Sequence, residues 1–292
     1  MITFIICLVA LVLGYVFYGA LTEKIFGMDP ARPTPAVANP DGVDSVPMDW
    51  KRIFLIQFLN IAGLGPIFGA VAGAMWGPVA FIWIVFGCIF AGAVHDFFSG
   101  MLSIRNGGAS IAEVVGMYLG PFFKHFMRLF SVVLLVLVGV VFVSGPAKIL
   151  SKIPSEIPPE ILNKIPSEIM SGFEFAFSFQ VCVYVIFAYY LLATLLPIDK
   201  LIGRIYPLFG LALLVMAAGI GYSLIAGGHA IPEMSFQNMH SNVEKYPIFP
   251  MLFITIACGA ISGFHATQSP LMARCVTSER LGRSELWIQM SG

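Results

Sequence analysis

Long apolar stretches separated by short polar segments dominate this chain. Seven of them reach the roughly 18–25 residues needed to cross a hydrocarbon layer of about 30 Å, at about 3–21, 52–75, 78–102, 126–147, 178–197, 205–227 and 248–271. The alternating segments of about ten residues that form a transmembrane barrel do not occur. The pattern predicts an all-α, polytopic transmembrane helix bundle over residues 1–292, with 272–292 as a cytoplasmic tail.

Composition agrees with this class. The chain has 292 residues, of which 58% are hydrophobic and 11% charged, and its formal net charge is zero. A soluble globular domain has about twice that charged fraction, and the neutral balance gives no reason to expect nucleic-acid binding. The cysteines have no metal-site spacing, so we expect small buried apolar side chains and no metal or cofactor: Cys7, Cys88, Cys182, Cys258 and Cys275.

The basic residues predict the orientation of the spans. The start of the chain lacks the positive region of a signal peptide, so it is expected to be a retained first span. If the N-terminus lies outside, four basic residues fall outside, Lys148, Lys152, Lys164 and Lys245. The other twelve then face the cytoplasm, as the positive-inside rule requires: Lys24, Arg32, Lys51, Arg52, Arg105, Lys124, Arg128, Lys200, Arg204, Arg274, Arg280 and Arg283.

Two loops stand out by composition. The proline-rich segment 22–51 excludes a long helix and is typical of a solvated linker. The segment 148–172 carries "KIPSEI" twice, at 152–157 and 164–169, and is expected to be a surface insertion.

Residues that weaken helices lie in the middle of the second span. The stretch "NIAGLGPIFG" (60–69) contains Gly63, Gly65, Pro66 and Gly69. Such a stretch either packs tightly on a neighbouring helix through small residues or interrupts the helix and exposes backbone groups to a solute or ion.

The seventh span repeats this feature. It reads "ITIACGAISGFHA" (254–266), with Gly259, Ser262, Gly263 and His265 near its middle. Spans two and seven are five helices apart and run in opposite directions, as expected of an inverted five-helix repeat. Paired interrupted helices in corresponding positions point to a substrate site. We therefore predict that Asn60, Gly63, Gly65, Pro66, Gly259, Ser262, Gly263 and His265 bind substrate.

Four stretches resemble the carbon starvation protein A (CstA) family: "MDPARPTPAVANPDGVDSVPMD" (28–49), "NIAGLGPIFGAVAGAMWG" (60–77), "FAGAVHDF" (90–97) and "FPMLFITIACGAISGFHATQSP" (249–270). The resemblance implies an inner-membrane transporter that takes up peptides during carbon starvation or pyruvate together with protons. It also implies a five-plus-five inverted-repeat fold like that of the amino acid–polyamine–cation superfamily. Family members continue through further spans, so the chain is expected to be an N-terminal part.

Ionisable residues at membrane depth are functional candidates by default. Asp96 lies in the third span beside His95, and both are predicted to act in proton coupling or as a gate. The alternative for Asp96 is an interfacial acid paired with Arg105 or Lys51. Neighbouring residues point about 100° apart on a helix, so no bond between His95 and Asp96 is expected.

Three other polar residues have simpler interpretations. The Asn60 amide could satisfy backbone groups freed by the first break. His265 could couple protons or serve as a structural donor. Ser110 and Glu113 form a capping-box pattern that predicts a helix start.

No sequence pattern of an enzyme occurs, whether GxSxG, HExxH, CxxC or a P-loop. The prediction is a secondary transporter for a small peptide or a small carboxylate, coupled to protons or sodium, with an anionic substrate group at helix N-termini at 63–66 and 259–263. The alternative is a non-transporting membrane module or inactive fragment in which the glycines serve packing alone. The oligomeric state is not predicted.

Overall fold

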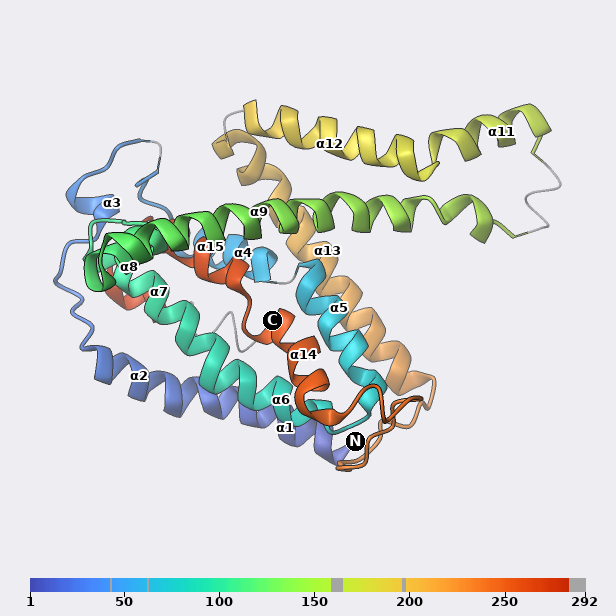
Figure 1. Ribbon diagram of the computed structural model, residues 1–292, viewed down its shortest axis with the longest axis horizontal. Helices are drawn as coiled ribbons and strands as arrows, with labels where there is room; N and C mark the ends of the chain where they lie inside the picture. The colour runs from blue at the N-terminus through green and yellow to red at the C-terminus, as the bar shows by residue number, and fades with distance from the viewer. Residues whose placement is uncertain (43, 62, 159–164, 196–197, 284–292) are drawn as a thin grey trace. The chain divides into compact units, whose positions relative to one another are not determined.

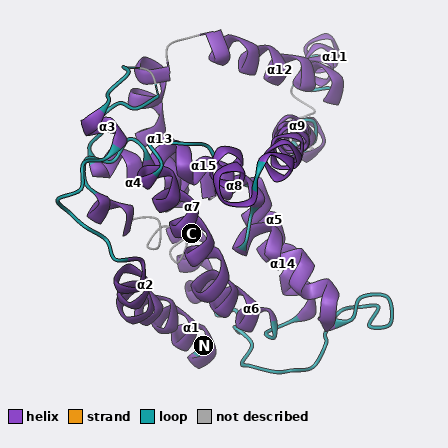
Figure 2. Ribbon diagram, turned by 60° about the vertical axis from the view of Figure 1, so that its left-hand side comes forward, coloured by secondary structure: helices purple, strands orange, loops and turns teal. Residues whose placement is uncertain are grey.

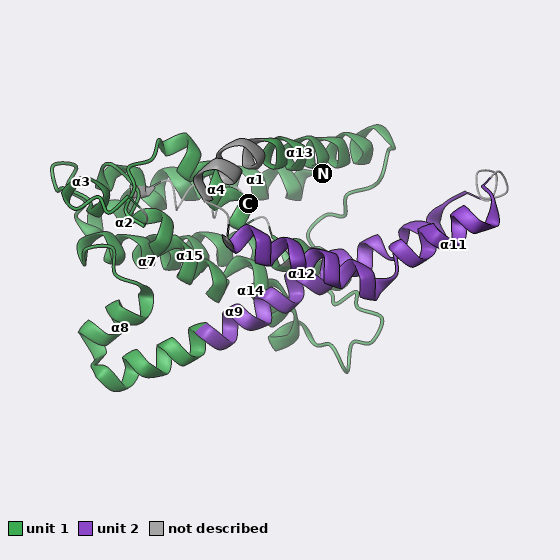
Figure 3. Cartoon of the chain, turned by 90° about the horizontal axis from the view of Figure 1, so that it is seen from above, with its two compact units in different colours: residues 1–131, 206–292 green, residues 132–205 purple. Residues whose placement is uncertain are grey.

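The computed structural model describes residues 1–42, 44–61, 63–158, 165–195 and 198–283 (Figure 1). Helices, turns and loops make up these residues, and none of them is in a strand (Figure 2). The chain divides into two compact units, residues 1–131 with 206–292, and residues 132–205 (Figure 3). The tail from 284 and the loop 159–164 lie outside the described residues.

The first part of unit 1 contains two long helical stretches, each with a wider, π-helical turn in its middle. The first runs through α1 (Ile2–Leu13), the π-helical η1 (Gly14–Tyr18) and α2 (Gly19–Phe26). The other runs through α6 (Ala80–Phe86), the π-helical η3 (Gly87–Gly92) and α7 (Ala93–Arg105). Between them lie α3 (Pro35–Ala38), α4 (Trp50–Ile61), α5 (Leu64–Gly73) and η2 (Ala74–Trp76).

The remaining elements follow α7. They are α8 (Ile111–Leu119), α9 (Pro121–Leu150), η4 (Ile153–Glu156), α11 (Ser167–Ala176), α12 (Phe179–Leu195), α13 (Ile198–Ala226), η5 (Ile248–Leu252), α14 (Phe253–Ala260), α15 (Gly263–Ala273) and η6 (Glu279–Arg283). The capping box at the start of α8 is confirmed, because the Ser110 amide and hydroxyl both donate to Glu113 Oε2, at 2.9 and 3.0 Å.

Five helical stretches are long and apolar enough to cross a membrane, and two bent helix pairs raise the number to as many as seven. The stretches are Ile2–Phe26, Ala80–Arg105, Pro121–Glu156, Leu208–Ala226 and Ile248–Ala273. The bent pairs are Trp50–Ile61 with Gly65–Trp76, and Ser167–Ala176 with Phe179–Thr194. The chain is thus an all-helical, multi-pass membrane protein. Each of the seven predicted spans overlaps one of these stretches or pairs, and the inverted repeat stays a prediction.

Both predicted interruptions are present in the helices. In the second span, α4 ends at Ile61 and α5 begins at Leu64, with Gly63 as an extended N-cap residue. In the seventh, α14 ends at Ala260 and α15 begins at Gly263, with Ser262 as the extended N-cap residue. Gly259 belongs to the last turn of α14, so the helix N-terminus predicted within 259–263 lies at the last residue of that range. The N-terminus of α15 starts at Gly263, because the chain leaves the helical conformation at Ile261.

The proline-rich segment does not form a solvated linker, because it packs on the residues after α15. The Ala36 amide donates to the Arg274 carbonyl at 3.2 Å, and the Met48 amide donates to the Cys275 carbonyl at 3.1 Å. The buried Thr34 hydroxyl donates to the Val276 carbonyl at 2.6 Å. These bonds close the end of unit 1 at which α7 finishes, which we call the Arg105 end.

The opposite end of unit 1, the Ile2 end, is closed by the segment 229–247. Glu233 accepts hydrogen bonds from the amides of Ile2 and Thr3, both at 2.9 Å, and from the N-terminal ammonium of Met1. Further along, the buried Trp76 indole donates to the Tyr246 carbonyl at 3.0 Å. The N-terminus and 229–247 therefore share one end, as the predicted topology requires.

Unit 2 contains the second part of α9, then η4, α11, α12 and the start of α13. The described residues of both KIPSEI copies are mostly exposed, in line with a surface insertion.

Candidate functional site

The two interrupted helices lie against each other at their glycines. The start of α5 lies beside the end of α14, and the helices run antiparallel (Figure 1). A Cβ atom placed on Gly259 would lie 2.7 Å from Pro66 Cα, and one on Gly69 would lie 3.0 Å from the Thr255 carbonyl oxygen. Small residues at these positions allow α5 and α14 to approach closely. The break before α5 therefore lies beside the break after α14.

Both interpretations of the glycines therefore have a physical basis, at different residues. Gly69 and Gly259 serve helix packing. Gly65 is less constrained, since a Cβ there would make ordinary contacts of 3.5 Å with Cys258. Gly63 and Ser262 are the N-caps of α5 and α15, and neither α5 nor α15 has a side-chain cap hydrogen bond. The role predicted for the Asn60 side-chain amide stays a prediction, because the first break includes residue 62, which lies outside the described residues.

A buried acid and two histidines lie beside the second break. The acid is Asp96 on α7, whose side chain is 2% exposed, and the buried histidine is His265 in the first turn of α15, whose side chain is 3% exposed. Asp96 Oδ2 lies 3.7 Å from His265 Nδ1. The other carboxylate oxygen, Oδ1, lies 2.9 Å from Nδ1 of His95, whose side chain is 40% exposed. The carboxylate therefore lies between one buried and one exposed imidazole.

Two sequence-based expectations for this acid are wrong. His95 and Asp96 do form a contact, because side chains of neighbouring residues can bend toward each other although their Cα–Cβ bonds diverge. Asp96 is also not an interfacial acid paired with Arg105 or Lys51. Arg105 pairs with Glu279, Nη2 to Oε2 at 3.2 Å, and the Lys51 ammonium lies over the Trp50 ring, 5.9 Å from its centroid.

Close packing of α7 on α15 sets this geometry. The Asp96 carbonyl accepts hydrogen bonds from the Ser99 hydroxyl at 2.9 Å and from the Ser269 hydroxyl at 2.8 Å. One turn further, a Cβ on Gly100 would lie 2.8 Å from Ser269 Oγ, so glycine permits the contact. The π-helical turn η3 directly precedes α7, and such turns are frequent at functional sites.

A second buried acid was not predicted from the sequence. Glu279, with no exposed side-chain surface, accepts hydrogen bonds from Arg105 Nε and Nη2 at 3.3 and 3.2 Å and from the Asp29 amide at 2.9 Å. Arg105 also donates to the carbonyls of Phe26 and Gly27. Because these groups come from three distant segments, the cluster holds the Arg105 end together.

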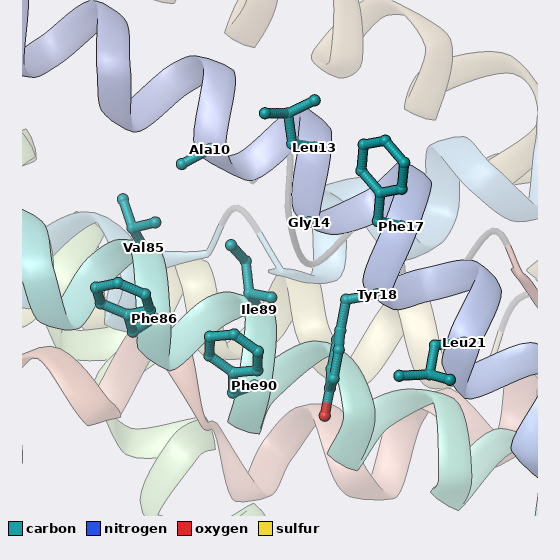
Figure 4. A pocket seen from close by; sticks show the side chains of 10 residues that line it. All are labelled: Ala10, Leu13, Gly14, Phe17, Tyr18, Leu21, Val85, Phe86, Ile89 and Phe90. Carbon is teal, nitrogen blue, oxygen red and sulfur yellow. The ribbon is translucent and has the colours of Figure 1, made fainter.

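An apolar groove of about 480 Å³ lies elsewhere in unit 1 (Figure 4). It runs between the two π-helical stretches and is lined by Ala10, Leu13, Gly14, Phe17, Tyr18, Leu21, Val85, Phe86, Ile89 and Phe90. It contains none of the predicted site residues, and its lining carries no ionisable group except the Tyr18 hydroxyl. It offers nothing to orient a charged solute.

The prediction that all five cysteines are buried is wrong for one of them. Cys182 and Cys275 are buried as expected, Cys7 and Cys88 are half-buried, and Cys258 is exposed, which is contrary to expectation. Burial raises the pKa of the Cys275 thiol, just beyond the seventh span. No group of three His, Cys, Asp or Glu side chains suited to a metal ion occurs among the described residues.

The sequence is similar to known membrane proteins. Chain residues 1–173 and 160–283 match the profile described as Carbon starvation protein CstA. An uncharacterized membrane protein of Haemophilus influenzae is 46% identical, with 97% of this chain and 85% of that protein aligned. No solved structure matches the chain.

Relatives with named activities are more distant and longer. The peptide transporter CstA of Escherichia coli is 29% identical over 88% of this chain and 43% of its own length. The pyruvate/proton symporter BtsT of the same organism is 27% identical over 88% of this chain and 42% of its own length. The chain thus spans less than half of these transporters but most of the Haemophilus protein. By its match over nearly the whole described sequence, this chain is a member of the carbon starvation protein CstA family.

Proposed function

We propose that this chain forms part or all of a secondary active transporter in the cytoplasmic membrane, which takes up a small peptide or pyruvate when carbon is scarce. Relatives named peptide transporter and pyruvate/proton symporter support this proposal. The N-terminus lies outside in this proposal, which agrees with the excess of basic residues on the cytoplasmic side.

One observation carries the proposal. Two interrupted helices from distant parts of the chain meet at their breaks, where α5 and α14 touch through Pro66 and Gly259. Interrupted backbone at membrane depth is tolerated where protein covers it or where it lines an aqueous cavity. The buried Asp96 and His265 beside the second break supply charge that packing alone does not require.

The substrate would bind at the two half-helix N-termini. The amides at the starts of α5 and α15 carry the positive end of the helix dipole, which attracts the carboxylate that pyruvate and peptides share. Gly63, Gly65, Ser262 and Gly263 provide these starts, with Asn60, Pro66, Gly259 and His265 nearby. The five-plus-five inverted repeat would then relate α4–α5 to α14–α15.

The competing function is a membrane module that transports nothing. The tight contacts at Gly69 and Gly259 favour this module, because packing alone explains why these two positions are glycine. They do not explain the buried acid and histidine, which make the transporter the better-supported function.

Uptake measurements test the proposal. Labelled pyruvate and a labelled dipeptide are offered in parallel to proteoliposomes that contain the full-length protein, under an inward proton gradient. We expect uptake of one solute that stops when the gradient is collapsed. If inserted protein takes up neither, and no exchange of either solute occurs, the transporter proposal is wrong.

The role of the break itself is tested by Gly65→Ala, because the added methyl group fits beside Cys258 without displacing backbone. Reduced affinity with normal protein stability would support a site at the break. Unchanged affinity would contradict it.

A further inference from the structure

We propose that His95, Asp96 and His265 form a proton relay, in which His95 exchanges protons with water in the transport pathway and Asp96 and His265 hold the proton inside the protein. This inference rests on the proposed function, because it names the groups that would couple transport to protons. It adds His265 as the inner acceptor, and it places the pathway on the His95 face of α7.

The depth and exposure of His95 carry the first step. In the span Ala80–Arg105, His95 is ten residues from one end and fifteen from the other, so it lies about 15–22 Å from either end at 1.5 Å per residue. Its side chain is nevertheless 40% exposed. An imidazole at that depth is costly against hydrocarbon and faces the bundle interior or a water-filled cavity. The exposed edge of His95 therefore marks the wall of the pathway.

Contact geometry carries the second step. A proton from water binds Nε2 of His95, and the proton on Nδ1 passes over 2.9 Å to Asp96 Oδ1. The carboxyl group then turns so that its new proton lies on the oxygen that faces His265, and this proton passes to the unprotonated Nδ1 of His265, which leaves Asp96 ionised again. At 3.7 Å this last contact is longer than a hydrogen bond, so α15 must approach α7 slightly for the transfer. One proton enters and one is stored, and no other bond changes.

Other charges near the relay have their own partners or lie at element ends. Those on α7, η3, α8, α4 and the segments after α15 are Arg105, Cys88, Glu113, Lys51, Arg52, Arg274, Glu279, Arg280 and Arg283, and the last two belong to η6. Arg105 pairs with Glu279 and Arg274 with Asp44, Glu113 accepts from Ser110, and Lys51 and Arg52 lie in the first turn of α4. The Cys88 thiol interacts with Asp96 but is uncharged in its protonated form.

The chemistry of the relay fits a proton better than sodium. A hard cation is bound by oxygen ligands, whereas the two groups beside the Asp96 carboxylate are imidazole nitrogens. The Asp96 carbonyl is already used by two serine hydroxyls. Chains of carboxylates and histidines at membrane depth are typical of proton relays.

Transport by variants provides the first test. The full-length protein in proteoliposomes should accumulate labelled pyruvate about tenfold under a gradient of one pH unit, if one proton accompanies each anion. Asp96→Asn and His265→Gln should abolish accumulation and retain exchange of labelled for unlabelled pyruvate. His95→Gln should slow accumulation. The matched control is His125→Gln, which alters an exposed histidine at the start of α9. A purely structural role would reduce accumulation and exchange together.

A second measurement does not depend on transport. Infrared spectra of the same proteoliposomes should contain a protonated carboxyl band that Asp96→Asn removes and whose frequency His265→Gln shifts. If accumulation survives Asp96→Asn, or if His265→Gln leaves the band unshifted, the relay is overturned and the proposed function still stands. If no solute is transported and the band is present and shifts, the relay stands and the proposed function fails.

Discussion

Adding one methyl group at Gly259 should destabilise the contact between the two broken helices. A Cβ atom there would lie 2.7 Å from Pro66 Cα, 3.2 Å from Pro66 Cβ and 3.4 Å from the Pro66 carbonyl oxygen. Two carbon atoms prefer about 3.5–4.0 Å, so α5 and α14 must separate by roughly 1 Å. Because the nearest atom is backbone, no side-chain rotation relieves the clash. Overpacking of this kind costs about 1–3 kcal/mol.

Gly65→Ala is the matched control, because the same methyl group meets Cys258 at ordinary distances of 3.5 Å. Alanine is also the better helix former, by up to about 1 kcal/mol in a helix interior. We expect thermal unfolding of the purified protein to shift downward for Gly259→Ala and to change little for Gly65→Ala. Equal melting temperatures for Gly259→Ala and the unsubstituted protein would refute the packing argument. A consequence for function follows: lost transport in Gly259→Ala alone says nothing about substrate binding.

Three further results are expected. Glu279→Gln removes one partner of a buried ion pair, which should destabilise the Arg105 end by about 3–5 kcal/mol. Because Cys275 is only 4% exposed, a thiol reagent should then label it faster, and an unchanged labelling rate would contradict this. The N-terminal ammonium and Thr3 lower the pKa of Glu233 to about 2, so its stabilising contacts should be complete above the ordinary value of 4.5 and be lost as pH falls through about 2. The melting temperature should therefore fall with pH across this range in the unsubstituted protein and in the control Glu244→Gln, but not in Glu233→Gln. The reverse pattern would disprove the assignment to Glu233. Ser110→Ala removes the cap of α8 and should cost about 1 kcal/mol in the same unfolding assay, where no measurable loss would count against the capping box.

Local chemistry made part of this structure predictable. Glycine and proline weaken a helix wherever they occur, so the interruptions at Gly63 and Ser262 could be located from the residues alone. A capping box involves residues three apart, which made the start of α8 at Ser110 readable as well. Apolar length likewise predicts spans without knowledge of their neighbours.

Contacts between distant segments could not be predicted in this way. Nothing near Asp96 indicates that His265 lies beside it, because that contact depends on how α7 packs on α15. Glu279 lies in a polar, charged segment that is typical of a solvated tail, yet it is fully buried. The proline-rich segment that contacts Glu279 through the Asp29 amide has a composition typical of a solvated linker, so neither partner indicated the contact.

The closure of the Arg105 end has a consequence for how the protein is made. The bonds from Thr34 and Ala36 reach Val276 and Arg274, which the ribosome synthesises about 240 residues later. At about 5–20 residues per second, the proline-rich segment waits at least about ten seconds for its partners. Glu233 similarly reaches Met1 only after most of the chain has been made.

The first helix therefore enters the bilayer long before either of its ends is secured. During that interval the buried faces of α1 and α2 have no completed bundle to join, and chaperones or the insertion machinery would have access to them. A nascent chain stalled before residue 274 would keep the Arg105 end open, and protease cleavage within 28–49 on such ribosome-bound chains would report it.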